Sequence, residues 1–379
     1  MVLAIEQLKK QYYDWRCWDY LYRKMKMNTK NQIRSTFDSY NSSIPYINKP
    51  GIAFSFDDSF RVRDWVTYGK DMFGFYDVKV TFNINAFHHY EGERKHTQDE
   101  IDMLIELQSN GHEIAHHGFR HKNVVRYTDE VGLEKWIKDE IISMFEWMEK
   151  QSHSKTGEKF TKPITFAFPY FASNEQTLKE IVPKYFKLAR GFQRGYNLTP
   201  FKHSGFVPSI CIDSEFLINP KNVSKILKLV KTSGCNLILT CHSILPDEVN
   251  WEIYGWPMTE HERKWRTSPR VIQYIINEAK KLGLEFYTTA ELSGVATFID
   301  RNFEKYVRNL LSKEPDEWIL LSDLTSIKEL DLSNQQINNL DGIQYFTSLE
   351  KLNITNSCIT DSRLLEKLPN LTIRYVNEN

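Results

Sequence analysis

The sequence predicts an α/β protein built on a parallel sheet or barrel, preceded by a helical segment and followed by a short repeat. The first observation is an alternation of short β-rich runs with helical stretches over roughly 250 residues, which is typical of βα units. The second is the length of 379 residues, enough for two or three domains at about 150 residues each. The third is a composition with 41% hydrophobic and 26% charged residues, which indicates a folded globular chain.

Residues 1–45 are predicted to form an N-terminal helical extension. This stretch is rich in Tyr and Trp and ends in a run of Asn and Ser residues before Pro45. We expect an amphipathic helix that packs on the central domain. An arm that binds a partner is the alternative.

Residues 46–300 are predicted to form the central domain. Its β-rich runs cover residues 51–56, 78–84, 165–168, 237–240 and 284–288. The helical stretches between them cover residues 97–110, 131–150, 222–233 and 268–282. In α/β barrels the chemistry lies on loops at the C-terminal ends of the strands. Polar residues that directly follow these runs are therefore the first candidates for a site.

Residues 301–379 are predicted to form a linker helix and a small C-terminal leucine-rich-repeat stack. Residues 327–334 recur as residues 349–356, and a degenerate third copy covers residues 371–379, at a step of 22 residues. This is the LxxLxLxxN pattern, in which each copy forms a short strand that stacks on the next. We expect its exposed strand face to bind a protein partner or a second copy of this chain.

Charge, cysteine content and hydropathy argue against several classes of protein. Lys+Arg and Asp+Glu are both 49, so the formal charge is zero, whereas nucleic-acid binding needs a basic excess. The five cysteines are an odd number with no CxxC pair, which favours reduced thiols over a disulfide framework or a zinc finger. No run approaches the about 18 apolar residues of a spanning helix, and Glu6 and Lys9 interrupt the apolar start. We expect a cytoplasmic protein without a signal peptide or membrane span.

Two adjacent carboxylates, Asp57 and Asp58, directly follow the first β-rich run. Neighbouring carboxylates at a strand end repel each other unless a cation or a proton-transfer role resolves the conflict. An Asp-Asp pair alone is more often a solvated turn than a site. Its weight therefore depends on what lies near it.

Four of the eleven histidines fall within ten residues, at His112, His116, His117 and His121. His117 and His121 are four residues apart, which predicts that both imidazoles lie on one face of a helical turn and suit one metal. His112 and His116 share that spacing, so geometry alone does not choose between the pairs. Two histidines and one carboxylate with open positions form a recognised catalytic metal arrangement.

In these motifs and their order, residues 46–295 resemble the polysaccharide deacetylases, the NodB-homology family grouped as carbohydrate esterase family four. Residues 55–59 are similar to the family's Thr-Phe-Asp-Asp-Gly motif, and residues 111–121 to its motif ending in His-(Ser/Thr)-x-x-His. Residues 166–170 resemble the third motif and residues 239–243 the last, Leu-x-His. The resemblance implies a distorted (β/α)7 TIM-like barrel.

The resemblance also implies a metal site. It selects His117 and His121 from the histidine cluster and adds Asp58 as the third ligand of a divalent metal. Zinc is the metal expected first, with cobalt or nickel as alternatives. The metal would polarise an amide carbonyl and acidify a water molecule.

The remaining catalytic roles follow from the same resemblance. Asp57 is expected to act as general base and His242 as general acid. The backbone N–H of Tyr170 is expected to stabilise the oxyanion.

Two departures from the family pattern bear on these roles. Ala167 stands where the third motif often has an arginine that orients the catalytic aspartate, and we expect Arg190 to substitute for it. A surface arginine is the alternative. The family element that tunes the catalytic histidine has no clean match, and Asp213 is its nearest candidate, beside His242.

The function expected from these observations is a metal-dependent carbohydrate deacetylase, a hydrolase of C–N bonds other than peptide bonds. Its substrate would be an acetylated amino sugar in a glycan or glycan precursor. One alternative is hydrolysis of another small amide or an O-acetyl ester at the same site. The other is a non-catalytic barrel that binds a glycan or protein, with the repeats recruiting a partner.

Overall fold

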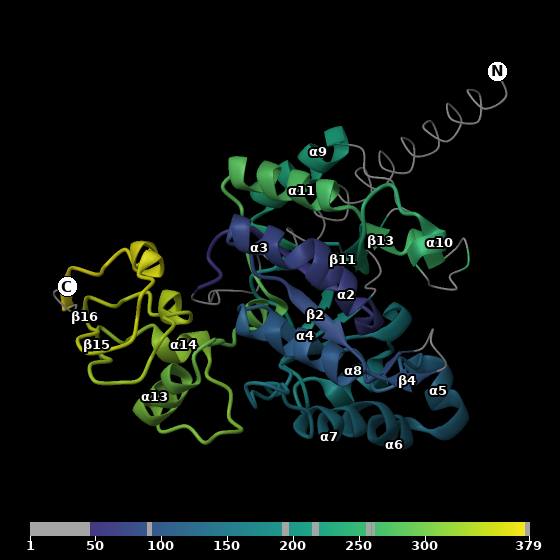
Figure 1. Cartoon of the computed structure of the whole chain (residues 1–379), viewed down its shortest axis with the longest axis horizontal. Coiled ribbons are helices and arrows are strands. Elements are labelled where there is room, and N and C mark those ends of the chain that lie inside the picture. Colours follow the sequence, from purple (N-terminus) through teal and green to yellow (C-terminus); the bar gives the residue numbers. More distant parts are fainter. Residues whose placement is uncertain are drawn as a thin grey trace.

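The structure is a computed structural model that describes residues 46–88, 93–191, 197–213, 220–254, 259 and 262–375. The predicted helical extension over residues 1–45 lies outside the described residues. Figure 1 shows a large α/β body with strands at its centre, and a smaller C-terminal part, coloured yellow-green to yellow, beside it.

A sheet that is parallel except for the β8–β11 pair forms the centre of the large body. Its strand order is β10-β11-β1-β2-β5-β6-β7-β9, with β14 pairing with β1 and β8 with β11. Because a single residue, Ser209, separates β9 from β10 along the chain, the two ends of the sheet lie close together and the sheet is nearly closed. This confirms the predicted α/β fold with a barrel-shaped sheet. The strands are β1 (Gly51–Phe56), β2 (Thr81–Ile84), β5 (Glu113–His116), β6 (Thr165–Ala167), β7 (Leu188–Gly191), β8 (Thr199–Pro200), β9 (Phe206–Pro208), β10 (Ile210–Cys211), β11 (Cys235–Cys241) and β14 (Glu285–Phe286).

Helices cover the outside of the sheet (Figure 1). Three of them match predicted helical stretches closely: α4 (Gln98–Ser109), α9 (Pro220–Ser233) and α11 (Pro269–Lys281). α11 shows why, because Ile272, Ile275, Ile276 and Ala279 recur at helical spacing and are all buried, which gives one apolar stripe facing the sheet. The predicted stretch 131–150 contains α6 (Leu133–Trp136), the π-helix η3 (Ile137–Ile142) and α7 (Ser143–Glu149).

The other elements of the large body are short connections. They are η1 (Ser59–Arg61), α2 (Val62–Trp65), η2 (Val66–Lys70), α3 (Asp71–Tyr76), β3 (Phe87–His88), β4 (Arg94–Lys95), α5 (Val124–Val131), η4 (Pro169–Phe171), α8 (Glu175–Ile181), β12 (Ser243–Ile244), α10 (Trp251–Tyr254), η6 (Glu262–Lys264), β13 (Arg266–Thr267) and α12 (Thr289–Leu292).

The strands at the centre are buried on both faces. All six residues of β1 and all seven of β11 are buried, which explains why both read as nearly continuous apolar runs rather than alternating ones. A polar residue at the end of such a strand therefore lies in an environment that contains little water. This is the setting in which the site residues lie.

The C-terminal part contains a parallel sheet with a constant register. Its strands β15 (Glu329–Asp331), β16 (Lys351–Asn353) and β17 (Ile373–Tyr375) pair at steps of 22 residues, as in Leu330↔Leu352 and Leu352↔Arg374. The 22-residue repeat seen in the sequence is thus the register of this sheet. The remaining elements here are α13 (Arg301–Leu311), α14 (Leu321–Leu324), η7 (Ile343–Tyr345) and η8 (Arg363–Lys367).

The C-terminal part packs against the end of the barrel at which the strands begin. Lys79, two residues before β2, forms an ion pair with Asp341. Tyr345 donates a hydrogen bond of 2.7 Å to buried Glu291 of α12. Apolar residues of both parts form one buried cluster. The strands' other end, where the site lies, is left uncovered by these contacts.

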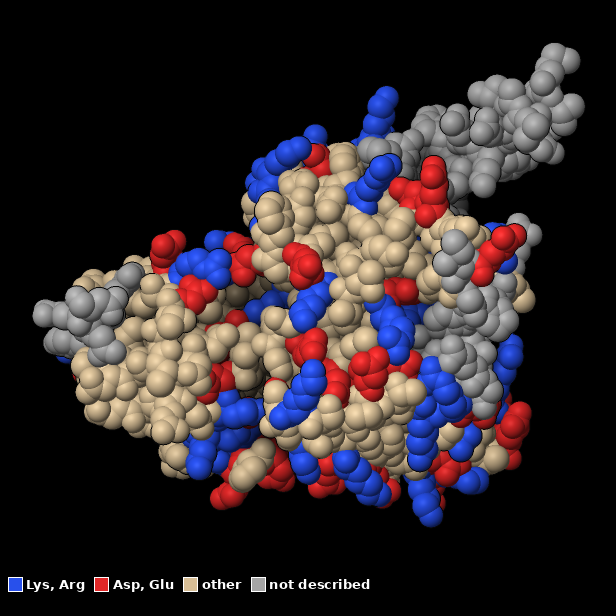
Figure 2. Space-filling view, viewed as in Figure 1, with Lys and Arg blue, Asp and Glu red and all other residues tan. Residues whose placement is uncertain are grey.

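The surface has no large region of one charge on the face that Figure 2 shows, where basic and acidic side chains alternate. This agrees with the balanced composition of 49 basic and 49 acidic residues. Within the described residues, every helix is too short or too polar to cross a membrane.

Candidate metal centre and catalytic site

The structure brings all seven predicted site residues together at the C-terminal ends of the strands. β1 is followed by Asp57 and Asp58, β5 by His117 and His121, β6 by Tyr170, and β11 by His242, while Arg190 lies within β7. This is the end of the barrel where the strand-end rule predicts function.

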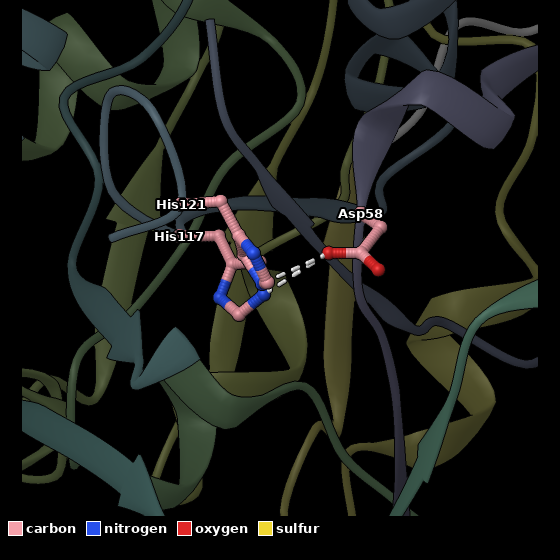
Figure 3. A group of neighbouring side chains, drawn as sticks. All are labelled: Asp58, His117 and His121. Atoms are coloured by element: carbon pink, nitrogen blue, oxygen red, sulfur yellow. Dashed lines mark ion pairs between the residues drawn. The ribbon is translucent and has the colours of Figure 1, made fainter. Parts of the chain in front are cut away.

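Asp58, His117 and His121 converge on one point. The Nε2 atoms of His117 and His121 lie 3.4 Å and 3.2 Å from Oδ1 of Asp58. Figure 3 shows the two imidazoles side by side, facing the carboxylate from across a small gap. All three side chains offer a ligand atom within 4.8 Å of the others. The arrangement can hold a divalent cation.

The protonation state of His117 fits this use. Its Nδ1 lies 2.8 Å from the carbonyl oxygen of Ala167, and because a carbonyl can only accept, Nδ1 carries the proton. In the neutral ring, Nε2 is then the atom whose lone pair is directed to the side of Asp58. Metal-ligating histidines commonly donate their other N–H in this way, which fixes the ring. Two imidazole nitrogens and one carboxylate are also a donor set that suits zinc or a similar ion.

The helical turn expected to carry His117 and His121 is absent, so that part of the spacing argument was wrong. Residues 117–123 lie outside any helix. The chain instead reverses through Gly118, at φ +84°, and His121, at φ +59°. The two rings still meet, with centroids 4.8 Å apart.

The alternative histidine pair is excluded by burial in the core. His112 packs edge-on against Phe73 and Phe82 and accepts a hydrogen bond from the backbone of Val80. Burial lowers the pKa of His112 and that of His116 to about 3. Both are buried core residues whose hydrogen bonds and ring contacts go to groups other than Asp58.

A buried carboxylate, Glu140 of η3, holds the His121 loop. It accepts hydrogen bonds from the backbone N–H groups of Arg120, at 3.1 Å and 3.2 Å, and of Lys122, at 3.2 Å. Burial raises the pKa of Glu140, and these N–H groups oppose that shift.

Asp57 is held by groups other than the histidine pair. Its Oδ1 accepts from Asn83 Nδ2 at 2.9 Å and from the guanidinium of Arg190. Its backbone N–H donates to the carbonyl of Cys241 at 2.8 Å. Asp58 therefore contacts the histidines, whereas Asp57 contacts an arginine. The two adjacent carboxylates thus have different surroundings, which allows them different roles.

Arg190 lies inside the barrel rather than on the surface. Its side chain is buried, and Nε donates to Ser55 at 3.1 Å. Ala167, where the family motif often has arginine, is the register partner of Arg190 on the adjacent strand. Register partners in a parallel sheet point to the same face. The guanidinium of Arg190 therefore starts from the neighbouring strand, at the same height along the barrel as Ala167.

His242 forms a pair with Asp213. Nδ1 of His242 donates to Oδ2 of Asp213 at 2.6 Å, which leaves Nε2 facing Asp58 Oδ2 at 3.7 Å. Burial lowers the pKa of His242, but three neighbouring carboxylates, Asp213 foremost, outweigh it and the net shift is upward. The adjacent Cys211 thiol donates to Asp213, and burial raises its pKa well above the usual value.

Tyr170 borders the metal-binding side chains. Its ring centroid lies 4.7 Å from that of His121, and its side chain is 65% exposed. Its backbone has φ +58°, close to the +66° of Asp58 and the +59° of His121. Non-glycine residues at positive φ are uncommon and gather at functional sites. Three of them around one point support a site here.

Sequence reasoning missed two residues that support the site. Asn83 lies inside β2, between Phe82 and Ile84, and an amide side chain in that place was a usable signal. Glu140 lies in the middle of a helical stretch, where an acidic residue is ordinary.

The fold and the site define an α/β barrel with a candidate metal centre at its strand ends. Residues 46–184 match the family model described as polysaccharide deacetylase, which supports a domain of this family in that part of the chain. No curated protein sequence matches the chain significantly.

Several solved structures are similar. One is a CE4 family pseudoenzyme from Bacillus anthracis, at 13% identity and TM-score 0.40, with 65% of this chain and 66% of that chain covered. The match thus spans about two thirds of that protein. Another is a family 4 acetyl xylan esterase from Clostridium thermocellum in complex with a cobalt ion, at 16% identity and TM-score 0.39, with 70% and 93% covered. A third is a polysaccharide deacetylase, named as putative, from Mycobacterium smegmatis, at 18% identity and TM-score 0.34, with 54% and 79% covered.

Proposed function

We propose that the chain is a metal-dependent hydrolase of the polysaccharide deacetylase family that removes N-acetyl groups from an amino sugar. One observation carries the proposal: the cluster of Asp58, His117 and His121 shares the strand ends with a carboxylate fixed by an arginine and a histidine fixed by a carboxylate. This is the set of groups that hydrolysis of an amide needs.

Asp58, His117 and His121 would hold the ion, and zinc is the metal we propose. When bound, a divalent cation supplies a Lewis acid that polarises the acetyl carbonyl and makes a water molecule more acidic.

Asp57 acts as the general base in this proposal. It removes a proton from the attacking water as the oxygen–carbon bond forms. Arg190 and Asn83 both donate to Oδ1 of Asp57, and these hydrogen bonds fix the position of the carboxylate. Their attachment also holds the carboxylate in one rotamer, which keeps it separate from the metal ligands.

His242 acts as the general acid. It protonates the sugar nitrogen as the carbon–nitrogen bond breaks, which yields acetate and a free amine. The hydrogen bond to Asp213 fixes Nδ1 as a donor and leaves Nε2 as the atom that faces the site. The backbone N–H of Tyr170 is proposed to donate to the oxygen of the tetrahedral intermediate.

We further propose that residues 301–379 carry a leucine-rich-repeat stack that binds a protein partner or a second copy of this chain. The 22-residue register of its sheet supports this. Asn334 and Asn356, at equivalent turns, have φ of 58° and 57°, and Asn356 donates to Asn334 at 3.1 Å.

The function is tested by measuring acetate released from N-acetylglucosamine oligomers and from an O-acetylated oligosaccharide that lacks acetamido groups. We expect release from the N-acetylated substrate, and at least 10²-fold less from it in Asp57→Asn, which removes the general base without touching a metal ligand. Faster release from the O-acetylated substrate would favour an esterase. No release from either, with metal bound, would favour a binding barrel.

A further inference from the structure

The loop that carries His121 lacks the internal support that a helix would give. Residues 117–123 lie between β5 and α5 outside any helix, and His121 itself has φ +59°. A non-glycine residue in this region costs about 1 kcal/mol or more and persists where the surroundings enforce it. Contacts from elsewhere in the chain must therefore hold His121.

Glu140 provides these contacts. Its carboxylate accepts from the backbone N–H groups of Arg120 and Lys122, the two residues that flank His121. The side chain is 1% exposed, so water does not compete for these hydrogen bonds. Hydrogen bonds from N–H groups to a buried carboxylate are among the stronger ones in proteins.

Gly118 makes room for the carboxylate. A Cβ atom at this position would lie 2.7 Å from Oε2 of Glu140, closer than two such atoms approach. The family motif has Ser or Thr here, between the two histidines. In this chain, a carboxylate that comes from a separate helix occupies the space next to that position.

The element that presents Glu140 is firmly anchored. η3 follows Trp136 and includes Ile137 and Ile141, all three of which are buried in one apolar cluster. Glu140 thus transmits the position of a packed helix to the backbone on both sides of His121.

We propose that Glu140 is a positioning residue that sets the place of His121 Nε2 and thereby the affinity of the metal site. The inference rests on the proposed function, because it assumes that His121 binds the ion. Glu140 acts through the backbone of the loop and touches neither the ion nor the substrate.

The test is a titration of the metal-free protein with Co²⁺ against a competing chelator, followed by visible absorption. Glu140→Gln keeps the size of the side chain but turns one acceptor into a donor that faces N–H groups. We expect its Kd for Co²⁺ to rise about 10- to 100-fold, the usual effect of losing a group that orients a ligand. We also expect its absorption spectrum to change shape, because the His121 geometry changes.

Glu291→Gln is the matched control. Glu291 is equally buried, at 3% exposure, and also accepts a backbone N–H, from Thr288 at 2.8 Å, but it lies at the opposite end of the barrel. We expect it to lose stability and to keep its Kd for Co²⁺ within about twofold, the scatter expected for a distant site.

Unchanged affinity and spectrum in Glu140→Gln would overturn the inference. So would an equal loss of affinity in Glu291→Gln, which would indicate a general loss of structure. If Glu140→Gln does not fold, Glu140→Asp carries the test: it keeps the charge but shortens the reach, and affinity equal to the unaltered protein would overturn the inference. Failure of the unaltered protein to bind Co²⁺ would instead remove the proposed function on which the inference rests.

Discussion

Arg190 and Asp57 form a buried ion pair across the inside of the barrel, between residues that are 133 positions apart in the sequence. Both side chains are nearly inaccessible, at 1% and 4% exposure. A buried charge that loses its partner is strongly disfavoured, so each side chain depends on the other for its place inside the barrel.

From this ion pair we predict how kcat changes when the arginine is removed from β7 and placed on the adjacent strand β6. Arg190→Ala should lower kcat by about 10²-fold or more, because Asp57 loses the group that orients it, while bound metal stays constant. Adding Ala167→Arg places a guanidinium at the same level on the adjacent strand and should restore part of the lost kcat. Steady-state kinetics and metal analysis on the two variants check this. Full activity in Arg190→Ala, or no recovery in the double variant, would contradict the assigned role.

The His242–Asp213 pair predicts a separate loss. In Asp213→Asn the amide can no longer accept from both Nδ1 and the backbone N–H of His242, as the carboxylate does. We expect kcat to fall by about 10²-fold or more, with KM and metal content unchanged, because the general acid is misoriented. Cys211→Ala is the control, since Cys211 also contacts Asp213 but takes no part in proton transfer. Similar kinetics in both variants would show that Asp213 has no special role.

Burial of His112 predicts a pH dependence of stability. Burial, with a smaller contribution from Lys79, lowers its pKa to about 3, against about 6.5 in an unfolded chain. Below pH 6.5 the unfolded chain binds a proton that the folded chain does not, so stability falls as the pH decreases toward 3. The expected slope from this group is about 1.4 kcal/mol per pH unit.

His112→Asn removes this titration and keeps an acceptor for Val80. Between pH 6 and 4, its free energy of unfolding in urea should fall less steeply than that of the unaltered protein, by up to about 1.4 kcal/mol per unit. Parallel curves would mean that His112 does not stay neutral in the folded protein.

The contact between Tyr345 and Glu291 predicts that the repeat and the barrel unfold together. Tyr345→Phe leaves a buried carboxylate without one of its donors, which should cost about 1–3 kcal/mol. Because the two parts share one apolar cluster, we expect a single thermal transition at a lower temperature, measured by calorimetry. Two transitions, with only the first shifted, would show that the parts fold independently.

The sequence predicted the fold well because its main signal is local. The apolar run over residues 235–241 indicates a buried strand, and the apolar stripe of α11 indicates a helix. Both patterns can be recognised without knowledge of the rest of the chain. Five strands of the sheet lie outside the predicted β-rich runs: β5, β7, β8, β9 and β10. In β5 the four residues, Glu113–His116, include a carboxylate and an imidazole, which are unusual in a buried strand.

Only those residues of the candidate site that belong to recognisable sequence motifs could be predicted. The three candidate metal ligands lie together as the resemblance implied, although the helical turn invoked for the histidines does not exist. The supports of the site, such as Glu140, come from residues that are distant in sequence and ordinary in type. No periodicity or local motif reports such contacts, since they depend on how the helices close around the barrel.

The most direct test of the account is acetate release before and after metal removal. The protein is treated with a chelator, assayed on N-acetylglucosamine oligomers, and then reconstituted stepwise with Zn²⁺ while bound metal is measured. We predict that activity is lost with the metal and returns in proportion to bound Zn²⁺, up to one ion per chain, the number that one cluster of three ligands holds. Undiminished activity in the metal-free protein, or reconstituted protein that holds one Zn²⁺ and releases no acetate, would contradict the account.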